Sequence, residues 1–86
     1  MTSRESRIRV ILTDLFTPDH LEVIDDSSRH AGHAGASPEG ETHFNIVIKA
    51  SAFGDMSRVA RQRAIMSALD EEFKTGLHAL SIKADS

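Results

Sequence analysis

The fold is decided near the end of the chain, by the stretch Gly76-Leu77-His78-Ala79-Leu80-Ser81-Ile82-Lys83. Its glycine can close a preceding helix, and the residues after it suit a β-strand. Strict alternation places His78, Leu80 and Ile82 on one face, with Leu80 and Ile82 reaching the core. His78 comes first, near the rim of the sheet, where a ring nitrogen can point outward. His78 is therefore the leading candidate for a functional side chain.

The residues before this strand predict a helix from about Arg58 to Phe73. Ser57 suits the N-cap, and Lys74 near the C-terminal end favours the helix dipole. Gln62 is the one polar residue on the expected buried stripe, so it should lie at the edge of the stripe or find a hydrogen-bond partner. The stripe consists of Val59, Gln62, Ile65, Met66, Leu69 and Phe73.

Three further elements are predicted upstream. Residues 3–16 form an amphipathic helix that ends before Thr17-Pro18, because the residue preceding proline is pushed out of helical geometry. Residues 21–25 form a short strand. Residues 41–50 form the clearest strand, since Phe44, Ile46 and Ile48 alternate with residues of the opposite face. The apolar face of the first helix consists of Ile8, Ile11, Leu12 and Leu15.

The order helix, strand, strand, helix, strand indicates an α+β fold. The first two strands make an antiparallel hairpin, and the last strand, which follows a helical crossover, pairs parallel with one of them. We expect a three-stranded mixed sheet covered on one face by two helices, with the other face in water. The chain has 86 residues, which is enough for one compact domain, 1–86.

Composition restricts the function classes. No apolar run approaches the length of a membrane span, and the first residues resemble neither a secretory signal nor a transit peptide, so a cytoplasmic location is expected. The chain has no cysteine, which excludes a disulfide, thiolate catalysis and a metal centre held by its own thiolates. Any metal must be bound through imidazole or carboxylate. The formal charge of −3 argues against strong non-specific binding of nucleic acid.

Five histidines, at positions 20, 30, 33, 43 and 78, are the most unusual feature of the composition. His30 and His33 lie three residues apart in the longest predicted loop, Asp26–Gly40, a segment of small and turn-forming residues. That spacing is compatible with metal binding, but surface histidines without a ligand role are the more frequent case. His43 points away from Phe44 and is free to bond across the hairpin or to face solvent, and His20 reads as a turn residue.

Enzyme motifs are missing from the sequence. It has no nucleophile elbow, no H-E-x-x-H motif and no glycine-rich phosphate loop. Binding to nucleic acid is the alternative, because Arg58, Arg61 and Arg63 open the second long helix and can reach phosphates. However, Gly54-Asp55-Met56-Ser57 has only the first glycine of the G-x-x-G loop of KH domains. Three arginines on one helix are more often a solvated face.

Four motifs in order carry a resemblance to a known family. They are Asp26-Ser-Ser-Arg-His30, Glu41-Thr-His-Phe44, Arg61-Gln-Arg63 and Gly76-Leu-His-Ala-Leu80. With these motifs the chain resembles the BolA family over nearly its whole length. The resemblance implies an α-β-β-α-β fold that is KH-like of the second type, in agreement with the pattern above. This sequence departs from that of many relatives at Gln62, where those relatives have histidine.

The resemblance also implies a partner. BolA-like proteins pair with monothiol glutaredoxins, and the heterodimer can hold a 2Fe-2S cluster to which the glutaredoxin and glutathione supply thiolates. One BolA ligand is a histidine of the last strand, a role that transfers to His78. The second ligand comes from the loop between the first two strands. This role transfers to His30 or His33, and the resemblance does not distinguish between them. Alone, the chain is expected to be a monomer or weak homodimer. Some relatives are described as DNA-binding regulators, which makes DNA the alternative partner.

Overall fold

The computed structural model describes residues 3–26 and 42–86. In these residues two longer helices, a short third helix and three strands follow one another in the predicted order. The elements are α1 (Arg4–Phe16), β1 (His20–Asp25), β2 (His43–Lys49), a 3-10 helix (Ser51–Phe53), α2 (Arg58–Ala68), α3 (Asp70–Lys74) and β3 (Ala79–Asp85).

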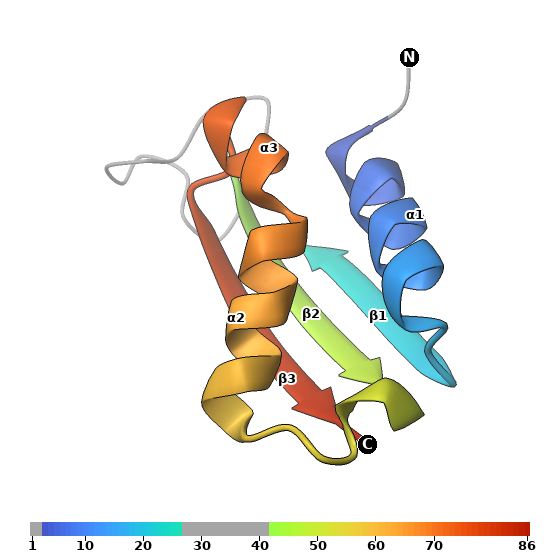
Figure 1. Cartoon of the computed structure of the whole chain (residues 1–86). Coiled ribbons are helices and arrows are strands. Elements are labelled where there is room, and N and C mark those ends of the chain that lie inside the picture. The colour runs from blue at the N-terminus through green and yellow to red at the C-terminus, as the bar shows by residue number, and fades with distance from the viewer. Residues whose placement is uncertain (1–2, 27–41) are drawn as a thin grey trace.

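The three strands form one mixed sheet in the order β1-β2-β3. β1 pairs antiparallel with β2, and β2 pairs parallel with β3, so that Phe44 lies opposite Leu80. Figure 1 shows α1 over β1 and α2 over the other two strands, on the same side of the sheet. The predictions of the α+β class, of the hairpin and of the parallel last strand are confirmed.

A single hydrophobic core fills the space between the helices and the sheet. The predicted alternation of β2 is confirmed, because Phe44, Ile46 and Ile48 are buried. The rings of Phe16 and Phe53 meet with centroids 4.9 Å apart, which joins the end of α1 to the 3-10 helix. On the other face of the sheet, Glu22 and Ser81 are exposed, as predicted for a face in water.

The first helix is capped as its sequence suggests. The Ser3 hydroxyl oxygen accepts a hydrogen bond from the Ser6 backbone N–H at 3.1 Å, which satisfies one of the free donors of the first turn. Ile8 and Leu12 are buried as predicted, but the prediction for Leu15 was wrong, since Leu15 is 60% exposed. The next residue, Phe16, packs against the core in its place.

The second predicted helix, 58–73, is interrupted at Leu69, which divides it into α2 and α3. The Ser57 cap is confirmed, with its hydroxyl accepting from the Ala60 N–H at 3.1 Å. The predicted stripe is confirmed at Ile65 and Leu69, which are buried, and was wrong at Val59 and Met66, which are exposed. Gln62 is exposed as well.

Candidate functional site

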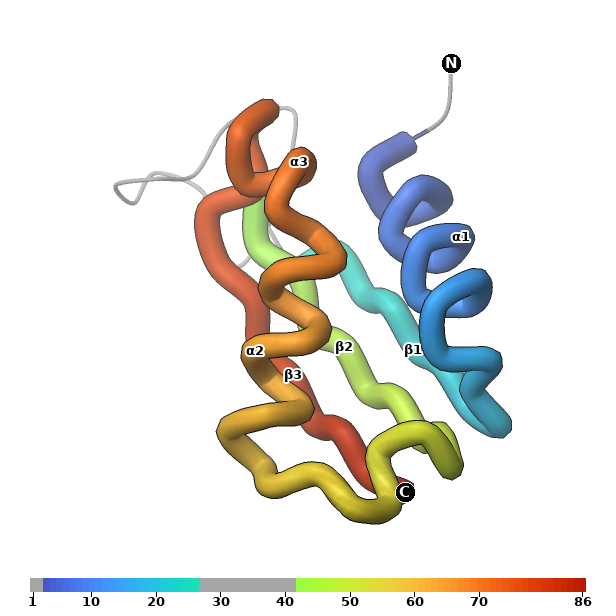
Figure 2. Tube along the Cα trace, in the orientation of Figure 1, coloured from blue at the N-terminus to red at the C-terminus, as the bar shows by residue number. Residues whose placement is uncertain are grey.

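The candidate site is a pair of histidines where β2 and β3 begin. His78 directly precedes β3 and is exposed, and His43 is the half-buried first residue of β2. Their ring centroids are 5.3 Å apart and the rings are tilted by 51°. Figure 2 shows the two strand starts side by side, as their parallel pairing requires. We call His43 and His78 the histidine pair.

The backbone before β3 departs from regular alternation. The carbonyl oxygen of Thr42 accepts from the N–H groups of both His78, at 2.8 Å, and Ala79, at 3.1 Å. The His78 ring therefore lies beside His43, while Leu80 packs against the core. The regular strand begins one residue after His78, at Ala79, so the predicted alternation applies only from Ala79 onward. An exposed ring at the rim of the sheet agrees with the prediction.

His43 also has a local contact. Its Nδ1 atom lies 2.9 Å from the hydroxyl oxygen of Thr42, a buried residue. This contact leaves Nε2 as the other ring nitrogen. The interaction orients the His43 ring beside His78, so the pair has one fixed and one exposed member.

His30 and His33 lie outside the described residues. Both attachment points of the segment that carries them, however, adjoin the histidine pair. The Asp26 N–H donates to the His43 carbonyl oxygen at 2.8 Å, and Thr42 directly precedes His43. The side chain of Asn45 also donates to the Asp26 carboxylate, at 3.3 Å. The histidine-bearing segment therefore leaves and re-enters the fold at the same place.

The length of an extended chain limits how far either loop histidine can lie from Asp26. An extended residue spans at most about 3.3–3.6 Å. His30 follows Asp26 by four residues and His33 follows it by seven. Length alone therefore does not distinguish the two candidates.

The donor atoms that the histidine pair offers at this end of the sheet are imidazole nitrogens. In the ranges 3–26 and 42–86, no group of three or more His, Cys, Asp or Glu side chains is placed to hold a metal ion. The chain also lacks cysteine. Imidazole is a common ligand of transition metals, so a metal ion at the histidine pair would need further ligands.

A buried ion pair stabilises the turn that precedes His78, and the sequence analysis did not identify it. Arg4 is 8% exposed and Glu72 is 5% exposed. Arg4 Nη1 donates to Glu72 Oε1 at 2.9 Å, and Arg4 Nη2 donates to the Thr75 carbonyl oxygen at 2.9 Å. The Glu72 carbonyl oxygen accepts from the Leu77 N–H at 2.8 Å. These bonds fasten α1, α3 and the turn before His78 to one another.

Gly76 completes this turn. Its φ is +130°, a backbone conformation that residues with a side chain rarely adopt. The prediction that a glycine ends the helical region here is confirmed. A Cβ atom here would lie 3.0 Å from Arg4 Nη2. Gly76 therefore lets the guanidinium group approach the backbone two residues before His78.

Spacing could have revealed the ion pair. Glu72 follows the buried residue Ile65 by seven positions, and Arg4 precedes the buried residue Ile8 by four. Both spacings return to the same face of a helix. Each of the two apolar faces carries one charge, and the two charges are opposite in sign. This pattern predicts an ion pair where the helices meet.

The pKa of the Glu72 carboxyl lies below its ordinary value. Hydrogen bonds from the Arg7 guanidinium are the largest cause; burial opposes them by raising the pKa, and the charges of Arg7 and Arg4 lower it further. Ionised Glu72 therefore stabilises the fold fully above the unfolded pKa of about 4.3. This contribution is lost as the pH falls through the lower, folded pKa.

We expect this loss to be measurable by urea unfolding between neutral and strongly acidic pH. Below about pH 4, the free energy of unfolding of the parent should fall faster than that of the Glu72→Gln variant, which has no proton to gain at this position. Other carboxyl groups titrate equally in both proteins. Parallel pH profiles would show that Glu72 is not responsible.

His20 is remote from the site. It is the first residue of β1 and lies opposite Lys49, at the other end of β2 from His43. Its Nε2 atom is 2.6 Å from Glu22 Oε2, and both side chains are exposed. The prediction of a turn residue was wrong, since the strand begins one residue earlier than expected. His20 therefore serves as a control in experiments on the histidine pair.

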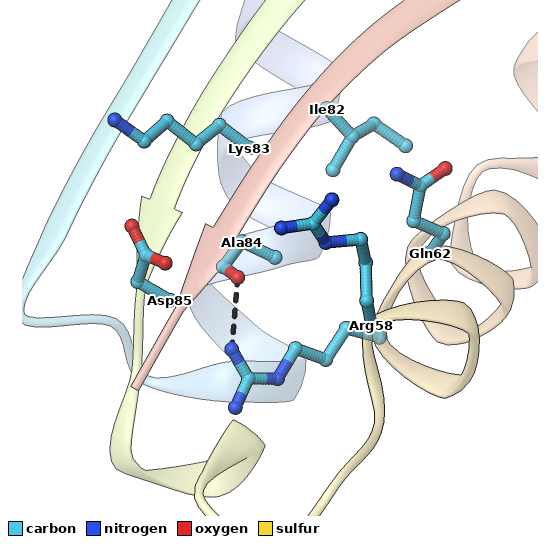
Figure 3. A pocket seen from close by; sticks show the side chains of 7 residues that line it. Arg58, Gln62, Ile82, Lys83, Ala84 and Asp85 are labelled. Carbon is cyan, nitrogen blue, oxygen red and sulfur yellow. Dashed lines mark hydrogen bonds between the residues drawn. The ribbon is translucent and has the colours of Figure 1, made fainter.

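The three arginines of the nucleic-acid alternative do not form one exposed set. Arg61 donates from Nε to the Met56 carbonyl oxygen and from Nη1 to that of Ala84, both at 3.0 Å. The second bond is the dashed line to the Ala84 carbonyl oxygen in Figure 3, at a pocket lined by residues of α2 and β3. Arg58 and Arg63 are exposed. Arg61 thus has a structural role at the free edge of the sheet.

Comparisons with known proteins give a consistent picture. A family model for BolA-like proteins matches residues 12–86. SufE-like protein 1, chloroplastic/mitochondrial, of Arabidopsis thaliana is 50% identical over 86 residues, covering 95% of this chain and 23% of the relative. Protein BOLA1, chloroplastic, of the same plant is 45% identical over 82 residues, covering 93% and 51%. The solved BolA domain of SufE1 from Arabidopsis thaliana matches with a TM-score of 0.88 and 48% identity, covering 99% of this chain and 93% of that one.

The chain spans only about a quarter and a half of the lengths of these two plant relatives. Both are named for organelles, so the cytoplasmic location stays a prediction. Within residues 3–26 and 42–86, none of the helices has the length and apolar character needed to cross a membrane.

Proposed function

Because this chain belongs to the family of BolA-like proteins, we propose that it is a non-enzymatic adaptor in iron–sulfur cluster handling and iron or redox regulation. It shares a 2Fe-2S cluster with a monothiol glutaredoxin. The observation that carries the proposal is the exposed His78 ring beside both attachment points of the segment with His30 and His33.

His78 and one of the two loop histidines supply the nitrogen ligands of this chain. The glutaredoxin and its glutathione supply the thiolates, which a chain without cysteine must obtain from a partner. When bound, a cluster with imidazole ligands has a higher reduction potential than one with thiolates alone. The buried Arg4–Glu72 pair holds the turn before His78, so that its ring is presented at a fixed place on the sheet rim.

The test is to mix the purified chain with a cluster-loaded monothiol glutaredoxin and to record visible absorption and circular dichroism. We expect the parent to give a heterodimer spectrum distinct from that of the glutaredoxin alone. His78→Ala should lose that spectrum, because an exposed imidazole that makes little contact with the core is removed without disturbing the fold. A spectrum from His78→Ala identical to that of the parent would exclude His78 as a ligand.

Two further sets of variants sharpen this experiment. His20→Ala removes an exposed histidine at the far end of the sheet and should leave the spectrum unchanged. His30→Ala and His33→Ala, made separately, identify the loop ligand as the one whose removal changes the spectrum. If neither change has an effect, the second ligand is not one of these two histidines.

DNA binding has less support as a function of this chain. The net charge is −3, and Arg61 is committed to the carbonyl oxygens of Met56 and Ala84. Two exposed arginines on one helix provide few of the phosphate contacts that such binding requires. DNA therefore stays an alternative partner predicted by the resemblance.

A further inference from the structure

The outer face of α2 carries apolar side chains that the fold does not use. Val59 is 58% exposed and Met66 is 41% exposed. With Arg58, Gln62 and Arg63 they line a shallow hollow of about 500 Å³. We call these five residues the α2 shelf. None of them contacts the histidine pair, so the shelf is a separate surface.

Helical geometry arranges the shelf as an apolar centre between two cations. At 3.6 residues per turn, Val59 and Met66 fall about 20° apart around the helix axis. Arg58 and Gln62 fall on one side of them, and Arg63 falls on the other. The apolar centre extends over two helical turns, about 10 Å along the axis.

The charge of α2 differs from that of the rest of the chain. Residues 58–68 contain three arginines and no acidic residue, whereas the whole chain has a formal charge of −3. Arg61 turns toward β3, which leaves Arg58 and Arg63 as the exposed cations beside the apolar centre. Complementary carboxylates can form charge-assisted hydrogen bonds with such guanidinium groups.

We propose that the α2 shelf docks an acidic amphipathic helix of a partner protein. Apolar side chains of that helix, one or two turns apart, cover Val59 and Met66, as in other complexes in which a helix binds a shallow groove. Carboxylates that flank the apolar side chains pair with Arg58 and Arg63. Burial of two exposed apolar side chains supplies affinity, and the charges fix the orientation.

Other occupants fit less well. A second copy docked shelf to shelf would bring the exposed arginines of the two copies, Arg58 and Arg63, against one another. Residues 27–41 contain no apolar side chain larger than alanine or proline and cannot fill the shelf. Nucleic acid uses phosphate contacts and has no need of Val59 and Met66.

Fluorescence anisotropy with the full chain tests the proposal. The probe is a labelled synthetic helix of about 18 residues with leucines at i, i+4 and i+7 and glutamates beside them, the pattern of an acidic amphipathic helix. A peptide of the same composition in scrambled order measures attraction by charge alone. We expect the ordered peptide to bind and the scrambled peptide to bind about tenfold more weakly or not at all.

Matched variants locate the binding site. Val59→Ser combined with Met66→Ser should weaken binding by about tenfold or more. Val10→Ser is the control, since Val10 is 59% exposed on α1, nearly the same as Val59. Arg58→Glu combined with Arg63→Glu should also weaken binding, whereas Lys49→Glu, on the open face of the sheet, should have little effect.

Several results would overturn the proposal. They are equal binding of the ordered and scrambled peptides, equal loss of binding in Val10→Ser and in the double variant Val59→Ser with Met66→Ser, or a dimer in sedimentation that this double variant dissociates. Binding of a DNA duplex but not of the peptide would do the same. The shelf variants should leave the cluster spectrum with glutaredoxin unchanged, so a failure of this proposal is distinguishable from a failure of the proposed function.

Discussion

Replacing Glu72 with alanine is expected to lower the free energy of unfolding by about 3–5 kcal/mol. The substitution leaves the Arg4 guanidinium, whose side chain is 9% exposed, without the carboxylate that it pairs with at 2.9 Å. A buried charge that loses its partner costs far more than an exposed one. The loss is a large part of the roughly 5–15 kcal/mol that stabilise a domain.

The neighbouring Glu71 provides the control. Its side chain is 79% exposed and pairs with Lys74 at 3.4 Å, so Glu71→Ala should change stability by no more than about 1 kcal/mol. Urea unfolding followed by far-ultraviolet circular dichroism gives both values, since the chain has no tryptophan or tyrosine for fluorescence. Equal effects of the two substitutions would show that the buried pair contributes nothing special.

A double substitution separates the pair from its surroundings. Arg4→Met combined with Glu72→Leu removes both charges and retains apolar volume. We expect this variant to be more stable than Glu72→Ala alone, because no unpaired charge remains in the interior. A double variant that is less stable than the single one would mean that the hydrogen bonds to Thr75 matter more than the charge.

Replacing Phe44 with alanine is expected to cost about 3–5 kcal/mol as well. Phe44 is 1% exposed in the central strand, where it lies between Asp25 of β1 and Leu80 of β3. The substitution removes the apolar contacts of the ring and leaves a cavity under the helices. Because Phe44 adjoins His43, the variant also shows how far the histidine pair depends on the core.

Two further variants calibrate this measurement. Phe44→Leu retains much of the volume and should cost less, so it yields a value even if the alanine variant does not fold. Phe73→Ala makes the same change at a half-buried position and should also cost less. If Phe73→Ala were as costly as Phe44→Ala, the core would not be centred on β2.

The strands were predictable from sequence because their burial follows a period of two. Phe44, Ile46 and Ile48 alternate in the sequence and are all buried in the structure. A shift of one residue would expose all three, so the pattern has a single solution. The turn glycine at position 76 was predictable for a similar reason, since the region after a helix commonly requires an unusual backbone conformation.

The orientation of α2 was not predictable in the same way. Val59 and Met66 were assigned to the buried stripe together with Ile65 and Leu69, but of these four only Ile65 and Leu69 are buried. A short helix with apolar residues over a wide arc admits several orientations. The choice between them depends on the packing of the sheet and on the bonds of Arg61 to the strand edge, neither of which appears in a local pattern.

The candidate site was predicted in part. The exposure of His78 followed from its place at the start of the last strand. Its contact with His43 did not, because that contact depends on the parallel register and on the two bonds accepted by the Thr42 carbonyl oxygen. The Arg4–Glu72 pair joins residues 68 positions apart: spacing places each charge on a buried helix face, but only the fold brings the two faces together.

Because β2 and β3 begin at the same end of the sheet, the chain beside the histidine pair can be changed without altering the core. Insertions between Asp26 and Thr42 leave the core sequence untouched, and doubling the length of a flexible connection costs only about 0.6 kcal/mol. Donor groups can thus be exchanged or repositioned there with little loss of stability. The interior of the fold and the residues beside the histidine pair can therefore diverge independently among related chains.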